Sequence, residues 1–185
     1  MTPLVGVIAD THVPQRLKRL PSGIAEAFEG VTLILHAGDI NSRPVLDELS
    51  RIAPVLAVAG NVDPPWLNLP RSRIVEVDGC RIGLTHGNGG WRRYLVNKVR
   101  ETLWEFEPAR YLRYARDAFQ DVNVVVTGHT HRPHLIYAEG VLLFNPGSVA
   151  PDYYTAYGPA VGVLFIEAGR ARAKLVPIGV DTQPE

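Results

Sequence analysis

Cysteine and net charge are both scarce in this sequence, and each shortage excludes a class of protein. The 185 residues include one cysteine, Cys80, so no disulfide can form within the chain, as is usual for proteins of a reducing compartment. The 19 Lys and Arg are balanced by 19 Asp and Glu, so bulk charge gives no sign of binding to nucleic acid or to a membrane surface. Any binding or chemistry must therefore come from particular residues.

Long hydrophobic runs are also absent, and the sequence is that of an ordinary globular domain. No run approaches the ~18 apolar residues that a membrane span requires, and the start MTPLVGVIAD has neither a basic segment nor a cleavage site of the kind found in secretion signals. We therefore expect one cytoplasmic domain over residues 1–185, with a homo-oligomer as an open alternative.

What the sequence does have is a set of short apolar runs, five of which end on residues that can bind metals. Runs so rich in Val, Ile and Leu predict buried strands. They cover about 4–9, 31–36, 54–59, 80–85 and 122–127.

The polar residues after these runs share the property of offering oxygen or imidazole nitrogen ligands. They are Asp10 and His12, Asp39, Asn61, His86, and His129 and His131. Ligands of open α/β sheets collect beyond the carboxyl ends of the strands, and residues two apart in an extended chain project to the same side. The set therefore predicts a site for two transition-metal ions, with Asp39 as the natural bridging carboxylate.

The order of the predicted elements favours two packed sheets. Helices at about 22–28 and 42–51 alternate with the first strands, as in parallel β-α-β units. Later strands are joined by tight turns at Asp78-Gly79, Glu139-Gly140 and Ala168-Gly169. A helical segment over 91–119 carries seven Lys and Arg against four acids; it could cap the site or attract a phosphorylated substrate, although a solvated face is the simpler interpretation.

At this point the motifs resemble those of a known family. The series Asp10-x-His12, Gly38-Asp39, Gly60-Asn61-x-Asp63, His86-Gly87 and Gly128-His129-x-His131 resembles the calcineurin-like metallophosphoesterase superfamily. It is most similar to the small YfcE-type phosphodiesterases, which share the Asn145-Pro146-Gly147-Ser148 element. The resemblance implies an α/β fold, a four-layer α/β/β/α sandwich of two mixed sheets flanked by helices.

The resemblance also implies a ligand set for two divalent ions, with manganese as the first candidate and nickel, iron and zinc as others. One ion would be held by Asp10, His12, Asp39 and His131, and the other by Asp39, Asn61, His86 and His129. Asp39 and Asn61 would also serve catalysis, and Asp63 and Asn88 would support the site or contact the substrate.

The activity implied by the resemblance is that of a metal-dependent phosphodiesterase. It would hydrolyse a small or nucleotide-like phosphodiester through a hydroxide shared by the two ions. A phosphomonoesterase on the same site is one alternative. Another is a non-catalytic interaction module like the retromer subunit of similar fold, although such modules normally lack some ligands and here every ligand position is filled.

Three departures from the family pattern bear on the substrate. Val62 stands where many relatives have a histidine near the leaving group, and Asn88 stands where many have the second histidine of His-Gly-His. Pro151 is followed by Asp152, where relatives often have Pro-Arg. Because valine cannot donate a proton, we expect diesters with good leaving groups to react much faster than simple alkyl diesters.

Overall fold

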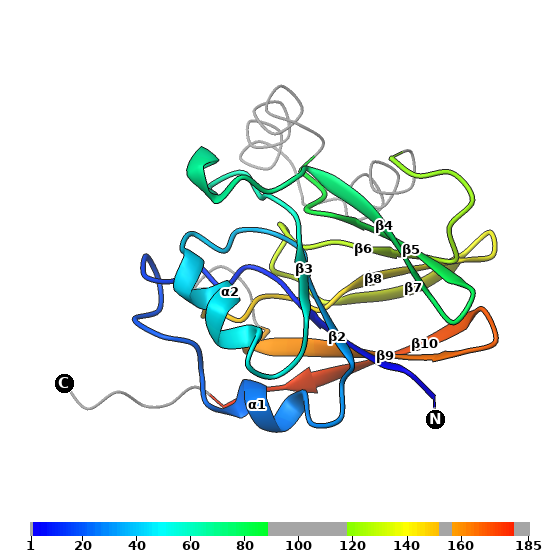
Figure 1. The fold of residues 1–185 in the computed structure, drawn as a ribbon, viewed down its shortest axis with the longest axis horizontal. Helices are drawn as coiled ribbons and strands as arrows, with labels where there is room; N and C mark the ends of the chain where they lie inside the picture. Colours follow the sequence, from blue (N-terminus) through cyan, green and yellow to red (C-terminus); the bar gives the residue numbers. More distant parts are fainter. Residues whose placement is uncertain (1, 89–117, 152–156, 180–185) are drawn as a thin grey trace.

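The computed structural model describes residues 2–88, 118–151 and 157–179, and this part of the chain is built around two five-stranded sheets (Figure 1). The first sheet has the order β10-β9-β1-β2-β3. Its strands are β1 (Leu4–Ile8), β2 (Leu33–His36), β3 (Val55–Ala57), β9 (Ala160–Glu167) and β10 (Arg170–Pro177). Strands β1, β2 and β3 are parallel, and β9 runs antiparallel to β1. The sheet is therefore mixed.

The second sheet has the order β4-β5-β6-β8-β7 and is also mixed. Its strands are β4 (Ser72–Val77), β5 (Cys80–Thr85), β6 (Val124–Val126), β7 (His134–Ala138) and β8 (Val141–Asn145). The three central strands β5, β6 and β8 are parallel, and the edge strands β4 and β7 each pair antiparallel with a neighbour. Both sheets thus place the carboxyl ends of parallel strands where loops can meet.

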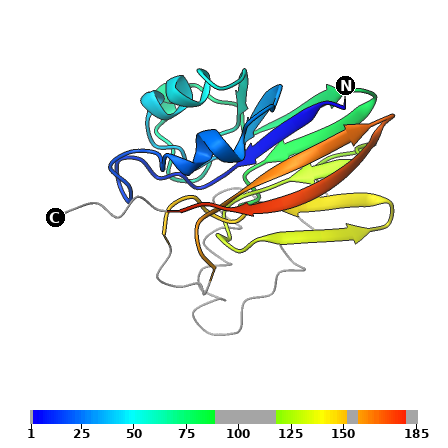
Figure 2. The same ribbon diagram turned by 90° about the horizontal axis from the view of Figure 1, so that it is seen from below.

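Helices α1 (Gly23–Ala27) and α2 (Arg43–Leu49) lie on one side of the first sheet (Figure 2). Successive side chains of β1 point to opposite faces of the sheet, and both faces are apolar, so each is covered by another layer. Ile8 packs with Ile24 and Phe28 on the helical side, whereas Val5 and Val7 pack between the two sheets. Among the described helices, none has the length and apolar character that crossing a bilayer would require.

Three strand glycines each lie against a phenylalanine ring, one in each apolar layer. Gly6 faces Phe28 on the helical side, Gly162 faces Phe144 between the sheets, and Gly83 faces Phe119 on the outer side of the second sheet. A Cβ atom at Gly83 would lie 2.6 Å from the ring of Phe119. Because glycine has no side chain, each of these positions leaves room for a large ring against the strand.

The predicted architecture of two mixed sheets is confirmed, and so are the three tight turns. Both residues of each turn have positive φ, for example 46° at Asp78 and 73° at Gly79, as type I′ hairpins require. The sequence did not predict the short 3₁₀ helix η1 (Pro65–Leu67). Residues 91–117 of the expected helical segment lie outside the described residues, so that segment and the second helical layer stay predictions, as does the single domain over residues 1–185.

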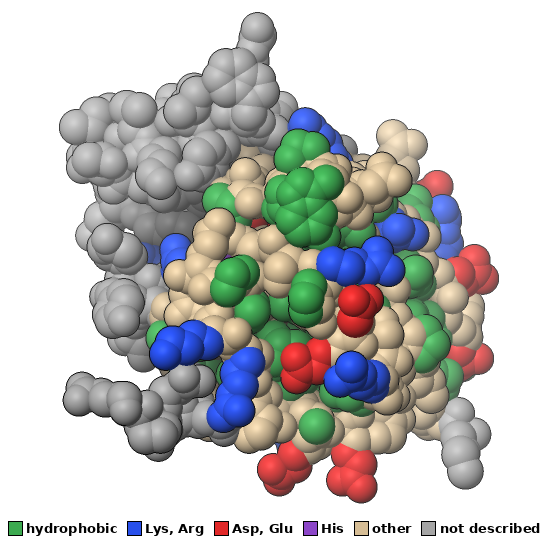
Figure 3. Space-filling model, turned by 60° about the vertical axis from the view of Figure 1, so that its left-hand side comes forward, with side chains coloured by type: hydrophobic (Ala, Val, Ile, Leu, Met, Phe, Trp, Pro, Cys, Tyr) green, Lys and Arg blue, Asp and Glu red, His purple; other side chains and the backbone are tan. Residues whose placement is uncertain are grey.

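Charged side chains are mixed on the surface seen in Figure 3, where basic, acidic and apolar residues alternate. No patch of one sign dominates the described atoms of that face. This agrees with the balanced composition of the whole chain.

Candidate metal centre

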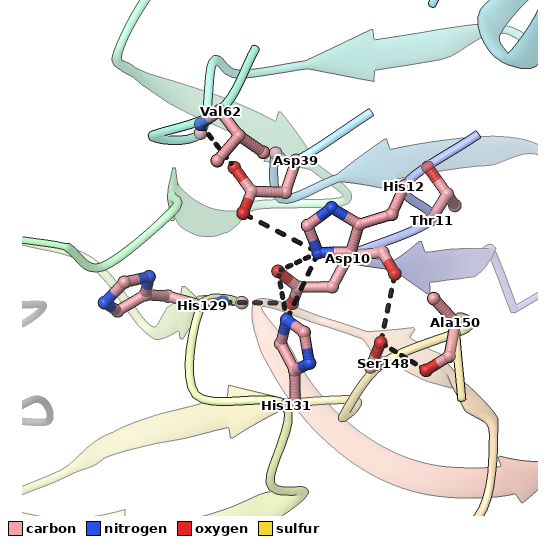
Figure 4. Close-up of polar contacts among 12 residues, drawn as sticks. Asp10, Thr11, His12, Asp39, Val62, His129, His131, Ser148 and Ala150 are labelled. Carbon is pink, nitrogen blue, oxygen red and sulfur yellow. Dashed lines mark hydrogen bonds and ion pairs between the residues drawn. The ribbon is translucent and has the colours of Figure 1, made fainter. Parts of the chain in front are cut away.

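The predicted ligands follow parallel strands and meet at one edge of the two sheets (Figure 4). The loop after β1 is joined to the loop after β2, because the His12 amide donates to the Asp39 carbonyl at 3.0 Å. The second sheet is joined to the first by the His129 amide, which donates to Asp10 Oδ2 at 3.0 Å. The site is thus assembled across both sheets.

The first group of ligand atoms comes from Asp10, His12 and His131, all buried, and its three atoms lie within 4.8 Å of one another. His131 Nε2 lies 3.3 Å from Asp10 Oδ1 and 3.3 Å from His12 Nε2. His12 Nε2 lies 3.9 Å from the same carboxylate oxygen. One carboxylate oxygen and two imidazole nitrogens therefore converge on a common point.

The second group consists of Asp10, Asp39 and His86, again buried and within 4.8 Å. Asp39 lies between the two groups: its Oδ1 is 3.4 Å from His86 Nε2 and its Oδ2 is 3.8 Å from His12 Nε2. This is the arrangement expected of a bridging carboxylate. Asp10 belongs to both groups as well, a sharing that the sequence did not suggest.

The site suits a cation, because buried carboxylate oxygens and imidazole nitrogens converge there. Asp10 Oδ1 is buried with no hydrogen-bond partner, which is costly unless a positive group fills the space. His86 donates from Nδ1 to the Ala37 carbonyl at 2.8 Å, the contact that directs the Nε2 lone pair of a metal-binding histidine. That nitrogen lies 2.9 Å from Asn61 Oδ1, to which it donates when the ring is protonated.

The electrostatics of the buried histidines lead to the same conclusion. Burial lowers the pKa of His86, but the carboxylates of Asp39 and Asp10 and the Ala37 carbonyl together outweigh it and raise this pKa to about 9. Burial would raise the pKa of Asp39, yet the charge of His86 contributes to holding that pKa well below its usual range. Without a cation, His86 therefore carries a second proton, on Nε2, and is positively charged at neutral pH. A bound cation would replace that proton.

His129 is placed differently from the other predicted ligands. Its ring meets His86 edge-on, with ring centroids 5.0 Å apart, and points away from Asp10 in Figure 4. Burial and the charge of His86 lower the pKa of His129 to about 3. Among the described residues it joins neither three-residue group, so its role as a ligand stays a prediction.

The ligands that lie two residues apart were expected in extended chain, and this expectation is wrong. His12 and His131 have φ of 49° and 55°, in the left-handed region rather than the extended one. His129 and His131 accordingly diverge, one toward His86 and the other toward His12. The loops turn sharply after each strand, and this turning delivers the side chains.

Asp63 holds two of the ligand loops through contacts with backbone amides. Its Oδ2 accepts hydrogen bonds from the amides of Asp39 at 2.9 Å and Gly60 at 2.7 Å. Its Oδ1 accepts from the amides of Ile40 and Asn41, both at 2.7 Å. One carboxylate thus fastens the loop after β3 to the loop after β2. Asn88, the last residue of the first described segment, is half-buried.

Two further buried residues support the ligand loops. The sequence indicates for His36 a place in the core or behind the ligands, whereas it indicates no supporting role for Ser148. Ser148 Oγ donates to the Asp10 carbonyl at 3.0 Å and to the Ala150 carbonyl at 2.8 Å. His36 accepts from the Gly38 amide at Nδ1, so its Nε2 donates to Thr11 Oγ1 at 3.2 Å. Burial lowers the pKa of His36 to about 4, so this ring is neutral.

Comparison with known proteins places this geometry in a family. The calcineurin-like phosphoesterase superfamily domain matches residues 4–168. A "Probable metallophosphoesterase" of Methanothermobacter thermautotrophicus is 38% identical over 177 residues, which are 95% of this chain and 93% of that protein. A phosphodiesterase of Methanocaldococcus jannaschii is 27% identical, covering 88% of this chain and 93% of the relative.

The solved structures agree on the fold. Vacuolar protein sorting 29 of Cryptosporidium parvum superposes with a TM-score of 0.68 at 23% identity, over 95% of this chain and 97% of that one. At this identity the likeness is one of fold alone. The domain match over 165 of 185 residues and the metallophosphoesterase relative go further, and together with the ligand groups they show that the chain belongs to the calcineurin-like phosphoesterase superfamily.

Proposed function

We propose that the protein is a dinuclear metal-dependent phosphodiesterase that hydrolyses a small or nucleotide-like phosphodiester. The observation that carries this proposal is the position of Asp39, whose two oxygens face histidines of two adjoining ligand groups. The name of the Methanocaldococcus relative, a phosphodiesterase, supports the choice of diesters.

The residues fit two ions that share ligands. Asp10, His12, His131 and Asp39 would hold one, and Asp39, Asn61, His86 and His129 the other. When bound, such ions supply Lewis-acid activation of water and of phosphoryl oxygens. Manganese is our first choice because a mixed set of oxygen and imidazole ligands accommodates it.

The chain's own contribution to the reaction is to orient the substrate. Asn61 turns its carbonyl oxygen toward His86, so its amide N–H groups are available to donate to a phosphoryl oxygen. The neighbouring side chain, Val62, is 41% exposed and cannot donate a proton. The leaving group must therefore depart without help from this position, which favours diesters whose leaving groups are stable anions.

The test is to strip the protein with a chelator and reload it with manganese, nickel, iron or zinc in separate samples. We expect two ions per chain by elemental analysis and hydrolysis of bis(p-nitrophenyl) phosphate faster than of p-nitrophenyl phosphate. One ion or none per folded chain would contradict the dinuclear centre. A faster monoester reaction would favour the phosphomonoesterase, and two ions without hydrolysis of either ester would favour the interaction module.

A further inference from the structure

Arg16 lies beside the ligands but has no place among them. It belongs to the loop between β1 and α1, and its amide donates to the His12 carbonyl at 2.8 Å. Its side chain is exposed, yet Nη1 lies 3.4 Å from His131 Nδ1. Nη1 donates to Nδ1 when the proton of the neutral ring is on Nε2. One turn of backbone thus holds an exposed guanidinium beside His131 of the first ligand group.

Among the described residues, His131 is the side chain that Arg16 contacts, and no acidic group neutralises its charge. Within the described segments, no carboxylate lies within ion-pair distance of the Arg16 guanidinium. By contrast Arg43, on the surface of α2, pairs with Asp47 at 3.1 Å. A guanidinium offers several N–H groups in a planar fork, and that fork matches the oxygens of a phosphoryl group.

Binding of a cation at His131 Nε2 would remove the hydrogen bond between His131 Nδ1 and Arg16. His131 Nε2 faces Asp10 and His12, whereas Nδ1 faces Arg16. A neutral ring that gives its Nε2 lone pair to a cation keeps its proton on Nδ1. Nδ1 and the guanidinium would then both be donors, and the guanidinium would need another acceptor close by.

We propose that Arg16 is a substrate-binding residue whose guanidinium holds a non-bridging oxygen of the phosphoryl group at the metal centre. The proposal rests on the proposed function and specifies it: Arg16 adds affinity for phosphoryl groups rich in terminal oxygens. A monoester or inorganic phosphate has more charge and more terminal oxygens than a diester. Arg16 therefore contributes more to the binding of monoesters and of inorganic phosphate than to that of diesters.

The experiment measures the binding of inorganic phosphate to manganese-loaded protein by calorimetry, with no turnover involved. A charge-assisted hydrogen bond contributes enough that Arg16→Gln should weaken phosphate binding about tenfold or more. Arg16→Lys keeps the charge without the fork and should lie in between. Lys18→Gln is the matched control, since it removes one positive charge from the same loop at an exposed position.

The kinetic arm compares KM and kcat for the two p-nitrophenyl esters. Arg16→Gln should raise KM for the monoester by a larger factor than for the diester. Equal phosphate binding by Arg16→Gln and Lys18→Gln would overturn the proposal, as would a wild-type protein that holds two ions and binds no phosphate. Loss of metal from Arg16→Gln would also overturn it, because Arg16 would then support the ions. If the wild type binds ions and phosphate but hydrolyses neither ester, and Arg16→Gln weakens phosphate binding where Lys18→Gln does not, the proposed function fails while the assignment of Arg16 to phosphate binding stands.

Discussion

Backbone strain is concentrated at the ligand residues. Asp10, Asp39 and His129 have φ of 53°, 56° and 72°, and His12 and His131 are likewise left-handed. Residues other than glycine adopt this backbone region rarely and at some energetic cost. The cost is tolerated because the loops are held by hydrogen bonds that Asp63 accepts, that Ser148 donates and that neighbouring backbone groups form. The left-handed backbone therefore costs local stability, and it directs the side chains of the ligands into the site.

Replacing Asp39 by asparagine should separate activity from folding. Asparagine tolerates positive φ, so the backbone should persist, but the negative charge facing both His12 and His86 is lost. We expect turnover to fall by about two orders of magnitude or more, with a shift of only a few degrees in the melting temperature of metal-free protein. Steady-state kinetics at saturating manganese and thermal unfolding measure the two effects. Near-normal turnover would show that Asp39 is not the bridge.

Asp63→Asn should destabilise the protein more than its partly exposed position suggests. The amide has one acceptor oxygen instead of two and presents N–H groups to backbone N–H donors. With four amides dependent on this side chain, we expect a loss of about 3 kcal/mol in the free energy of unfolding, together with weaker metal binding.

Urea titrations of Asp63→Asn and of the control Asp47→Asn give the comparison. Asp47 pairs with Arg43 on the surface, where an ion pair contributes ~0–1 kcal/mol. Similar effects of the two substitutions would refute the supporting role of Asp63.

Val62→His should change how the rate depends on the leaving group. In the native protein we expect log rate for a series of aryl and alkyl diesters to fall steeply as leaving-group pKa rises, because valine supplies no acid. The histidine should flatten that slope. A flat native plot with chemistry rate-limiting would mean that another acid serves the site.

At the scale of elements, the strands owe their close packing to glycines that accept phenylalanine rings. Gly162 on β9 lies under Phe144 of β8, which brings the two sheets together, and an added methyl group would overlap the ring. Gly162→Ala should therefore cost ~1–3 kcal/mol through overpacking. Gly158→Ala is the control, because nothing lies within 4 Å of a Cβ atom there. Equal denaturant midpoints for the two variants would show that the ring shifts without cost.

At the scale of the whole molecule, the fold should survive removal of the metal. One apolar cluster lies between α1, α2 and the first sheet, and another lies between the sheets. Both are built from residues that do not ligate ions. Chelation should thus abolish hydrolysis while circular dichroism remains native-like, with the unfolding temperature lowered only by the lost binding energy. Collapse of the spectrum on chelation would make the ions structural.

The sequence by itself determined the parts of the protein that depend on local pattern. Short Val-rich and Ile-rich runs specified the strands, and Asp-Gly and its equivalents specified the turns. Asp39 and His86 could be named as candidate ligands because each follows a strand. These features are recognisable because neighbouring residues control strand and turn formation. The order of the motifs also predicted the family.

Only the tertiary structure decided how the ligands are grouped and what surrounds them. Asp10 is shared between both groups, His129 turns toward His86, and Arg16 reaches His131 from a loop whose sequence looks unremarkable. Two of these relations, those of His131 with Asp10 and with Arg16, join residues more than a hundred positions apart. They depend on left-handed turns and on the packing of two sheets, and the spacing of residues along a chain does not encode either one.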